Sequence, residues 1–383
     1  MDFDLSEEQS ILKDSLEKLL GDRYGFEERR RVLASPEGFS ADMWARYAEM
    51  GLMALPFAEE DGGLAGTPVE TGIVMEALGR ALALEPYLAT VVLGGGLLRF
   101  GGSTEQRAEF IPQVAGGELK LAFGHTERNS RYDLNHVETT ATRDGDGWVL
   151  SGQKSVVTGG DSADHVFVTA RTAGGARDEG GIGVFMVDAK ADGLSRRGYA
   201  NQDGQRAAEI TLDKVRVPGE RVIGEAEGGL PLVRRVADAA IAALCSEAIG
   251  VMEATHRLTV DYLKVRKQFG VPIGAFQVLQ HKAVDMFVAM EQARSITLYA
   301  TMMADSEDAG ERARAMHAAK AEVGRAGRLV GETAIQLHGG VGMTMELAVG
   351  HYFKRMTMID IAFGDHDHHL RALAAKGGLM AAA

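Results

Sequence analysis

The sequence predicts an α+β protein that is mostly α-helical, with one β-rich segment between two helical ones. Apolar residues recur at helical spacing as far as about Gln113, short β-branched runs begin at about Leu121, and helical spacing returns after Gly228-Gly229. Runs of helices, then strands, then helices again are typical of separately packed domains. We therefore expect three domains in this chain of 383 residues, at 1–119, 120–228 and 229–383.

The N-terminal helical segment begins with a capping box. Ser6 is followed three residues later by Gln9, so each side chain can bond the backbone amide of the other residue. Apolar residues then recur at helical spacing and predict a helix with one apolar face: Ile11, Leu12, Leu16, Leu19 and Leu20.

The central segment predicts antiparallel strands. Gly, Asp and Asn clusters separate its short alternating or β-branched runs, which is typical of hairpins. Thr172–Gly181 is predicted to be a surface loop. The predicted strands are Trp148–Leu150, Val156-Val157, His165–Thr169, Ile182–Val187 and Glu209–Val217.

The C-terminal segment predicts three long helices at about residues 231–268, 275–305 and 310–337. Arg266, Phe269 and Gly270 stand at i, i+3 and i+4, so we expect them to share a helix face. A guanidinium there could bind a pyrophosphate bidentately, although a solvated helix arginine is the common alternative.

Two further groups in this segment allow both a binding and a structural interpretation. Gln277 and Gln280 lie one helical turn apart and could bind an adenine edge, but surface glutamines are common on helices. Gln336, Gly339 and Gly340 mark a helix end, where glycine is a frequent C-cap and where free backbone amides can also hold phosphate.

Composition excludes some functions. The formal charge of −13 argues against binding to nucleic acid or to an anionic membrane surface. The only cysteine, Cys245, fits a reducing compartment and a core position, and MDFDLSEEQ has no signal-peptide pattern. The apolar stretch Ala89–Leu98 is too short for a membrane span and contains three glycines. We expect a cytoplasmic protein.

Two C-terminal segments carry a resemblance to a known family. YLKVRKQFGVPIGAFQVLQHKAVDM at 262–286 and QLHGGVG at 336–342 resemble the flavin-binding segments of the acyl-CoA dehydrogenase family. Residues 51–63 and 215–224 resemble two further motifs of the family, so the resemblance covers nearly the whole chain. It implies an N-terminal helical domain, a central antiparallel β domain and a C-terminal four-helix bundle. It also implies FAD-dependent α,β-desaturation of an acyl-CoA thioester.

The resemblance assigns FAD contacts unevenly. Of the residues that hold a subunit's own flavin ring, Thr126 and Thr158 are kept, whereas Arg128 replaces a proline and Val156-Val157 lack the stacking tryptophan. The residues that the family lends to the FAD of a neighbouring subunit are all kept: Arg266, Phe269, Phe276, Gln277, Gln336, Gly339 and Gly340. The losses therefore affect this chain's own flavin site.

The family's catalytic base is missing from its usual place. The resemblance places its glutamate at Phe363, or in some members at Ala240, and neither residue accepts a proton. A positioned carboxylate is worth about 10²–10⁴-fold in rate. Asp365 is the weak alternative if the loop shifts, and Glu247 lies on the helix face of Ala240 but roughly 10 Å along the axis.

We expect no metal site. The His and Asp residues of Gly364–His369 are expected to form the polar start of the last helix, because no second ligand pair accompanies them.

Three functional hypotheses follow. The first is a small subunit resembling that of pimeloyl-CoA dehydrogenase, which completes the FAD site of a large-subunit homologue within a tetramer of unlike chains. The second is a self-sufficient homotetrameric acyl-CoA dehydrogenase that uses Asp365 or Glu247 as its base. The third is a non-catalytic acyl-CoA- or FAD-binding protein. The family implies an acyl-CoA substrate, an electron-transfer flavoprotein as electron acceptor, and a role in fatty acid or dicarboxylic acid degradation.

Overall fold

The computed structural model describes residues 5–379, and the chain forms two compact units. The helical unit contains Met1–Arg31, Pro68–Ala83 and Ile241–Ala383, and the sheet unit contains Val32–Thr67 and Leu84–Ala240. The expected domain boundaries at 119/120 and 228/229 stay a prediction.

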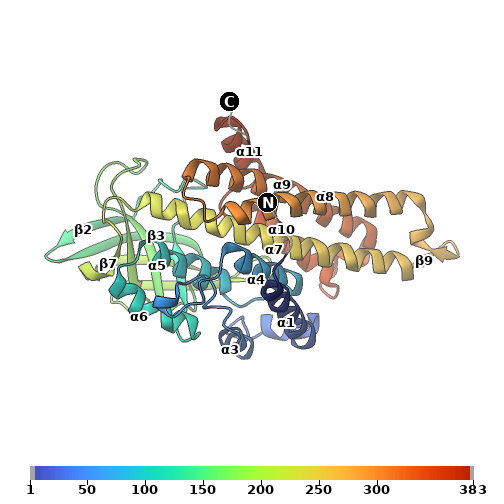
Figure 1. Ribbon diagram of the computed structural model, residues 1–383, viewed down its shortest axis with the longest axis horizontal. Helices are drawn as coiled ribbons and strands as arrows, with labels where there is room; N and C mark the ends of the chain where they lie inside the picture. Colours follow the sequence, from blue (N-terminus) through green and yellow to red (C-terminus); the bar gives the residue numbers. More distant parts are fainter. Residues whose placement is uncertain (1–4, 380–383) are drawn as a thin grey trace. The chain divides into compact units, whose positions relative to one another are not determined.

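In Figure 1 the helical unit contains the dark blue helix α1 and the yellow-to-red helices from α7 to α11. Its elements are α1 (Glu7–Arg23), the start of α2 (Phe26–Leu33), α4 (Pro68–Ala81), most of α7 (Leu230–Val265), β9 (Lys267–Gln268), β10 (Val271–Pro272), η4 (Ile273–Ala275), α8 (Gln277–Met303), α9 (Ala309–His338), η5 (Gly339–Met343), α10 (Ala348–Ile361) and α11 (His366–Ala375).

Local sequence signals explain several of these elements. The capping box at α1 is confirmed, since the Ser6 side chain accepts from the Gln9 amide and the Gln9 side chain from the Ser6 amide. Leu16 and Leu20 form the buried face of α1, whereas Ile11 at its start is 59% exposed. The expected helix at 231–268 ends earlier, at Val265.

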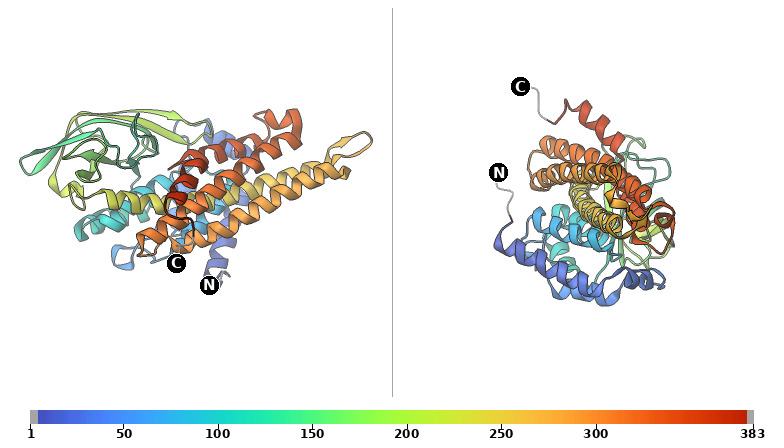
Figure 2. Two further views of the ribbon diagram at one scale, coloured as in Figure 1. Left: turned by 90° about the horizontal axis from the view of Figure 1, so that it is seen from above. Right: turned by 90° about the vertical axis from the view of Figure 1, so that its right-hand side faces the viewer.

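Close helix packing in the helical unit depends on glycines. A Cβ at Gly250 of α7 would lie 1.9 Å from the Glu76 carbonyl oxygen of α4, and one at Gly79 would lie 2.1 Å from the Glu247 carbonyl oxygen. The backbones of α4 and α7 therefore touch at two points. In Figure 2, α8 and α9 run side by side, with the β9–β10 hairpin at the tip of the unit.

The sheet unit carries short helices beside one large sheet. Its helical elements are α3 (Ala41–Glu49), η1 (Glu59–Asp61), the π-helical turn η2 (Leu88–Gly94), α5 (Gly95–Gly101), α6 (Thr104–Ala115), η3 (Gly219–Arg221) and the start of α7. Its strands are β1 (Leu121–Gly124), β2 (Thr140–Asp144), β3 (Gly147–Thr158), β4 (His165–Arg171), β5 (Ile182–Asp188), β6 (Leu194–Ala200), β7 (Arg206–Val217) and β8 (Val222–Ile223).

The sheet is mixed, which corrects the expectation of a wholly antiparallel domain. The strand order is β6-β7-β3-β2-β4-β5-β8, with β1 beside β4. β4 pairs in parallel with both β1 and β2. A parallel pair needs a long connection, and the β2–β3 hairpin supplies it between β1 and β4. Periodicity shows that a strand exists but carries no information about its neighbour's direction.

One bulged strand replaces two expected ones. Trp148–Leu150 and Val156-Val157 both belong to β3, whose register against β7 shifts between Leu150 and Gly152 and again between Lys154 and Val157. Each bulge inverts the alternation of side chains, so a continuous strand looks like two short ones. β6 was missed because it is a mostly exposed edge strand with no buried alternation.

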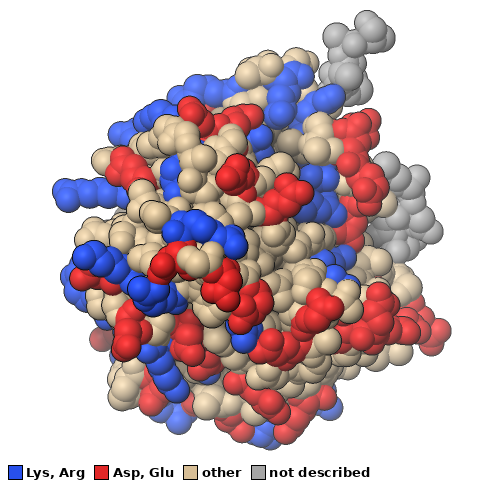
Figure 3. All heavy atoms as spheres, turned by 90° about the vertical axis from the view of Figure 1, so that its left-hand side faces the viewer, with Lys and Arg blue, Asp and Glu red and all other residues tan. Residues whose placement is uncertain are grey.

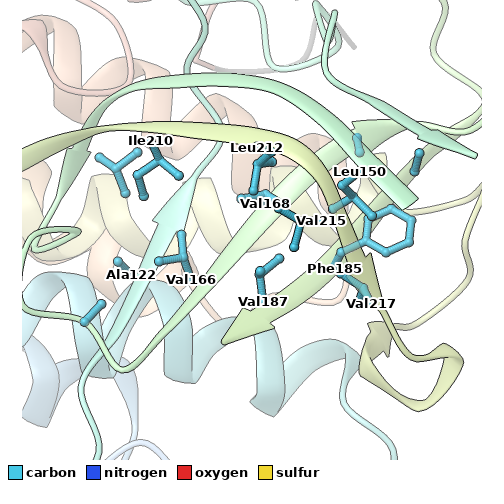
Figure 4. Packing of buried hydrophobic residues seen from close by; sticks show 14 of the residues in the cluster. Ala122, Leu150, Val166, Val168, Phe185, Val187, Ile210, Leu212, Val215 and Val217 are labelled. Carbon is cyan, nitrogen blue, oxygen red and sulfur yellow. The ribbon is translucent and has the colours of Figure 1, made fainter. Parts of the chain in front are cut away.

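The core of the sheet unit lies on the inner face of its curved sheet (Figure 4). Trp148 packs edge-on against Phe185 at 5.5 Å between ring centroids. The labelled residues that share this core are Ala122, Leu150, Val166, Val168, Phe185, Val187, Ile210, Leu212, Val215 and Val217.

Two observations concern binding to nucleic acid and crossing of a membrane. On the face drawn in Figure 3, Lys and Arg side chains lie interspersed with Asp and Glu side chains, so this face offers no continuous basic surface. Among residues 5–379, no helix combines the length and apolarity that a membrane crossing requires.

Candidate cofactor and substrate site

The β9–β10 hairpin corrects the expected helix face at Arg266, Phe269 and Gly270. The helix α7 ends at Val265, and the chain turns back through Phe269 and Gly270, with φ of 51° and 82°. A two-residue turn with both φ angles positive matches the twist of a β-hairpin. The helical spacing of these residues is therefore coincidental, although the hairpin still groups them.

The hairpin presents a free cation and two aromatic rings. The Arg266 side chain is exposed, and its guanidinium bonds no other residue within 5–379. Phe269 is 90% exposed, and its ring meets that of Phe276 edge-on at 6.1 Å. The Arg266 carbonyl accepts from the Ile273 amide at 2.8 Å, which ties the start of the hairpin to the segment that leads into α8.

The N-terminus of α8 is a second anion-binding element, which the sequence analysis missed. Its N-cap is Phe276, whose side chain makes no capping hydrogen bond. The amides of Gln277 and Val278 therefore bond no other residue of 5–379, whereas those of Leu279 and Gln280 donate to the Phe276 carbonyl. A helix N-terminus with amides left over in this way favours an anion. The absence of Ser, Thr, Asp or Asn at position 276 was the signal that could have indicated it.

The end of α9 lies beside the last turns of α7. The rings of Tyr262 and His338 stack at 4.5 Å, and the Tyr262 hydroxyl lies 3.4 Å from the His338 carbonyl oxygen. Gly339 is the C-cap with φ of 64°, as expected, and it is exposed together with Gln336 and Gly340. A helix C-terminus repels anions, so positive charge for a phosphate has to come from Arg266 and the start of α8.

In the sheet unit, Thr126 and Thr158 belong to adjacent segments. The Ser155 amide of β3 donates to the Thr126 carbonyl at 2.9 Å, three residues before Thr158. The two segments are close at Gly124, where a Cβ would lie 3.1 Å from the Lys154 side chain and would push it aside. The structure thus brings the segment after β1 against the last residues of β3.

A buried ion pair supports this junction. Lys154 is 0% exposed, and its ammonium donates to Glu127 at 2.6 Å and to the Thr169 hydroxyl at 2.9 Å. Glu127 also accepts from the Glu138 and Thr139 amides at 2.7 and 3.0 Å. Burial alone would raise the pKa of Glu127, but Lys154 and these hydrogen bonds bring it below its ordinary value.

The same pair controls the charge of His125. Burial lowers the pKa of Lys154 to about 8, against the attraction of Glu127. Burial and the positive charge of Lys154 lower the pKa of His125 to about 4, so its imidazole is neutral at pH 7. Lys154 was not singled out from the sequence, although a lysine at a buried position of a strand is a signal for a paired charge.

Val156, where the resemblance expects the stacking tryptophan, has a strained backbone. Its φ is 52°, an outlier for a β-branched residue, and its side chain is 48% exposed. The carboxylate of Glu209 holds it by accepting from the Val156 amide at 3.2 Å, and from the Tyr199 hydroxyl at 2.7 Å.

Phe363 occupies a turn between α10 and α11 that buried side chains hold in place. Its φ is 57° and that of Gly364 is 117°. Lys320 is 0% exposed, and its ammonium donates to the carbonyls of Asp360 and Gly364, each at 2.7 Å. Nε2 of His369 lies 3.1 Å from the Phe363 carbonyl oxygen. Three carbonyls of the turn are thus held from the interior.

The carboxylates considered as alternative bases have structural roles. Asp365 is the N-cap of α11 and accepts from the His368 amide at 2.8 Å. Glu247 is buried, and its two oxygens accept from Nε and a terminal nitrogen of Arg355, both at 2.6 Å. Ala240 is fully buried.

The remaining polar candidates also have structural roles. The segment Gly364–His369 leads into α11, as expected. Within residues 5–379, no three His, Cys, Asp or Glu side chains are grouped in a way that could hold a metal ion. Cys245 lies in the core as expected, where burial raises its pKa to about 12.

The residues fit a dinucleotide such as FAD at the hairpin end of the helical unit. A free guanidinium, an available helix N-terminus and exposed aromatic rings suit a pyrophosphate joined to flat heterocycles. The sheet unit offers Thr126 and Thr158 beside the neutral His125.

Comparison with known protein families covers nearly the whole chain. Residues 6–118, 122–215 and 227–378 match the models for the N-terminal, middle and C-terminal domains of acyl-CoA dehydrogenase. Probable acyl-CoA dehydrogenase YngJ of Bacillus subtilis is 29% identical over 95% of this chain and 96% of its own length.

Solved structures share the fold. The steroid ACAD Tcur3481-Tcur3483, solved as a variant, is 29% identical with a TM-score of 0.86, covering 97% of each chain. The FAD complex of PigA is 25% identical with a TM-score of 0.90, covering 99% of this chain and 100% of PigA. The ChsE4-ChsE5 complex of Mycobacterium tuberculosis is 24% identical with a TM-score of 0.90 over all of both chains, which shows the fold alone.

Proposed function

Because the chain belongs to the acyl-CoA dehydrogenase family, whose cofactor is FAD, we propose that it is the small subunit of a two-chain acyl-CoA dehydrogenase. The subunit is of the type found in pimeloyl-CoA dehydrogenase. One contrast carries the proposal. The residue at the family's base position is Phe363, whereas the residues expected to serve a neighbour's FAD are exposed and Arg266 has no partner within 5–379.

In this proposal the chain binds and orients but does not remove the proton. Arg266 and the Gln277 and Val278 amides would hold the pyrophosphate of the FAD in the partner's site, and Phe269 and Phe276 would cover it. When bound, the cofactor would supply the acceptor for the hydride that leaves the β-carbon of the acyl-CoA as its α-proton is removed. The partner's glutamate takes that proton, and the electrons pass on to an electron-transfer flavoprotein.

Asp365 and Glu247, the two alternative bases, already have structural roles. This supports the need for a partner chain that supplies the base. Using Asp365 as a base would remove the N-cap of α11, and using Glu247 would break a buried bidentate ion pair. The Lys320 and His369 contacts also oppose the loop shift that Asp365 would require. Without a positioned base, desaturation would be slower by about 10²–10⁴-fold.

An exposed apolar surface supports assembly with another chain. It extends from the end of α7 through the hairpin to the first half of α8, which includes the candidate FAD residues. A monomer rarely exposes so many large apolar side chains together. The exposed fractions are 73% for Val265, 90% for Phe269, 61% for Val278, 57% for Val284 and 48% for Phe287.

The decisive experiment measures flavin per chain. We would purify this chain alone and together with a co-expressed large-subunit homologue that retains the Glu-Gly pair, and measure FAD by absorbance. We expect a colourless lone chain and a yellow complex with one FAD per pair of unlike chains. One FAD per chain and full turnover without a partner would overturn the proposal.

One substitution tests the alternative hypothesis that this chain is a self-sufficient acyl-CoA dehydrogenase with Asp365 as its base. Asp365→Asn keeps a capping side chain but cannot act as a base. If the lone chain were active, loss of turnover in Asp365→Asn with unchanged thermal stability would identify Asp365 as the base. The proposal expects the complex to keep its turnover in this variant.

A further inference from the structure

A cavity of about 410 Å³ lies within the helical unit, walled by α1, α4, α7 and α8. Its size falls in the range of small-molecule sites. None of the candidate FAD residues lines it. At Gly72 the walls are already in contact, since a Cβ there would lie 3.1 Å from the Ser246 hydroxyl and 3.4 Å from Thr301. The helices therefore cannot close the cavity by moving together.

The cavity is amphipathic along its length. Arg294 of α8 donates to Glu76 of α4 at 2.9 Å, whereas Gly72 of α4 meets Thr301 of α8. The later residues of α4 therefore face the earlier residues of α8, and this end is charged. The opposite end is lined by aliphatic side chains, among them Val69, Ile73, Leu298 and Met302.

The charged end leaves a hydrogen-bond donor unused. Arg80 and Arg294 share the carboxylates of Glu76 and Glu253. Arg80 also pairs with Glu17 and Arg294 with Glu291, so four carboxylates offset these two charges. Nε of Arg80 is buried without a partner in the described chain. Lys13 also lines the cavity, and its ammonium pairs with no carboxylate of residues 5–379.

Thr297 gives the second, independent observation. It lines the cavity one turn from Arg294, is 4% exposed, and its hydroxyl has no partner among the described residues. Other buried hydroxyls of this unit are satisfied: those of Thr255 and Thr259 donate to the carbonyl four residues earlier at 2.7 and 2.8 Å. A buried hydroxyl without a partner is costly, so a group inside the cavity is its natural partner.

We propose that this cavity binds a short aliphatic carboxylate. Its oxygens accept from the Thr297 hydroxyl and face Nε of Arg80 and the Lys13 ammonium, while its chain lies against Val69, Ile73 and Met302. These unused groups are all donors, which selects a hydrogen-bond acceptor. The charge of Lys13, which no carboxylate of residues 5–379 offsets, favours an anionic one. This site goes beyond the proposed function and does not depend on it.

The test uses the purified full-length chain and hexanoate, with hexan-1-ol as the uncharged probe and sodium chloride at matched ionic strength. Thermal unfolding and isothermal titration calorimetry measure binding. We expect hexanoate to bind saturably at millimolar concentration and raise the unfolding temperature, with little effect of hexan-1-ol. Absence of hexanoate binding means a water-filled cavity and overturns the proposal. Equal binding of the alcohol overturns the recognition of a carboxylate.

Three variants locate the binding. Thr297→Val removes the hydroxyl at constant shape, so hexanoate should bind at least about tenfold more weakly, which corresponds to loss of one hydrogen bond. Thr259→Val is the matched control and should bind hexanoate like the native chain. Met302→Trp fills the apolar end from a position that is 37% exposed and should abolish binding. Unchanged binding in both Thr297→Val and Met302→Trp would place hexanoate elsewhere and refute the site.

Discussion

Two regions of the helical unit use polar groups in opposite ways. In the segment from Arg266 to Gln277 the aromatic rings are exposed, and the Arg266 guanidinium and the Gln277 amide bond no other residue of 5–379. In the Phe363–Gly364 turn, Lys320 and His369 hold three backbone carbonyls, and the Asp365 side chain caps the next helix. The first region has the chemistry of a surface that meets a ligand or another chain. In the second region, the same kinds of groups stabilise the turn between α10 and α11.

Residue type alone does not identify a functional site. Asp365 and Glu247 are plausible bases by chemistry, but each already has a hydrogen-bonded role in the fold. Arg266 is an ordinary arginine by sequence, and its lack of a partner within the described chain distinguishes it.

The largest effect should come from the buried pair of Glu247 and Arg355. Glu247→Gln leaves the guanidinium buried without its counter-charge, and we expect a loss of about 3 kcal/mol in the free energy of unfolding, measured with urea. The double variant Glu247→Leu/Arg355→Met should recover most of this loss. Native stability in Glu247→Gln would contradict the structural role assigned to this carboxylate.

Substitution of Arg266 should affect cofactor binding and leave stability nearly unchanged. Arg266→Ala should change the stability of the free chain by less than about 0.5 kcal/mol, because the side chain is exposed. It should weaken FAD retention in the two-chain complex by about 1.5–3 kcal/mol, measured by flavin release on dilution. Arg328→Ala, an exposed arginine paired with Glu332 on α9, is the matched control and should leave FAD retention unchanged. A stability loss without FAD loss would contradict the role.

The turn region should be sensitive to acid. His317 of α9 belongs to this region, because its Nδ1 lies 2.9 Å from Nδ1 of His369. Burial, with the positive charges of Lys376 and His368, lowers the pKa of His317 from 6.5 to about 4, and burial lowers that of His369 to about 2. Between pH 6.5 and pH 4 the unfolded chain binds a proton at position 317 that the folded chain excludes, so stability falls as pH falls.

For His317 this contribution is on the order of 2 kcal/mol by pH 4. Urea unfolding at pH 7 and pH 4 should show a smaller difference in His317→Gln than in the native chain. An unchanged difference would mean that His317 is protonated in the folded state.

The smallest effect should come from the exposed tip of the hairpin. Phe269 has φ of 51°, which costs a non-glycine residue about 1 kcal/mol. Phe269→Gly should therefore raise the stability of the free chain by about 0.5 kcal/mol, after the extra entropy of glycine in the unfolded chain is subtracted. The same variant should weaken the two-chain complex. Phe269→Ala, which loses the ring but keeps the strain, should weaken the complex without stabilising the chain.

Local sequence signals predicted some elements well because nearby residues decide them. The capping box at Ser6 and Gln9, the C-cap at Gly339 and the three long C-terminal helices depend on contacts within a few residues, and all are present. The mixed sheet and the continuous β3 were not predicted, because pairing partners and bulges depend on strands far apart in the chain. The hairpin at Phe269 was misassigned because helical spacing arises by chance in short windows.

Residue order alone was enough to identify the family and the order of helices and strands. Tertiary structure alone decided which charged groups are free. It paired Glu247 with Arg355, and Lys154 with Glu127, while leaving Arg266 and the Thr297 hydroxyl without partners among the described residues. The physical reason is that a hydrogen bond or ion pair depends on positions in space, and residues 108 apart in the chain can supply its two halves.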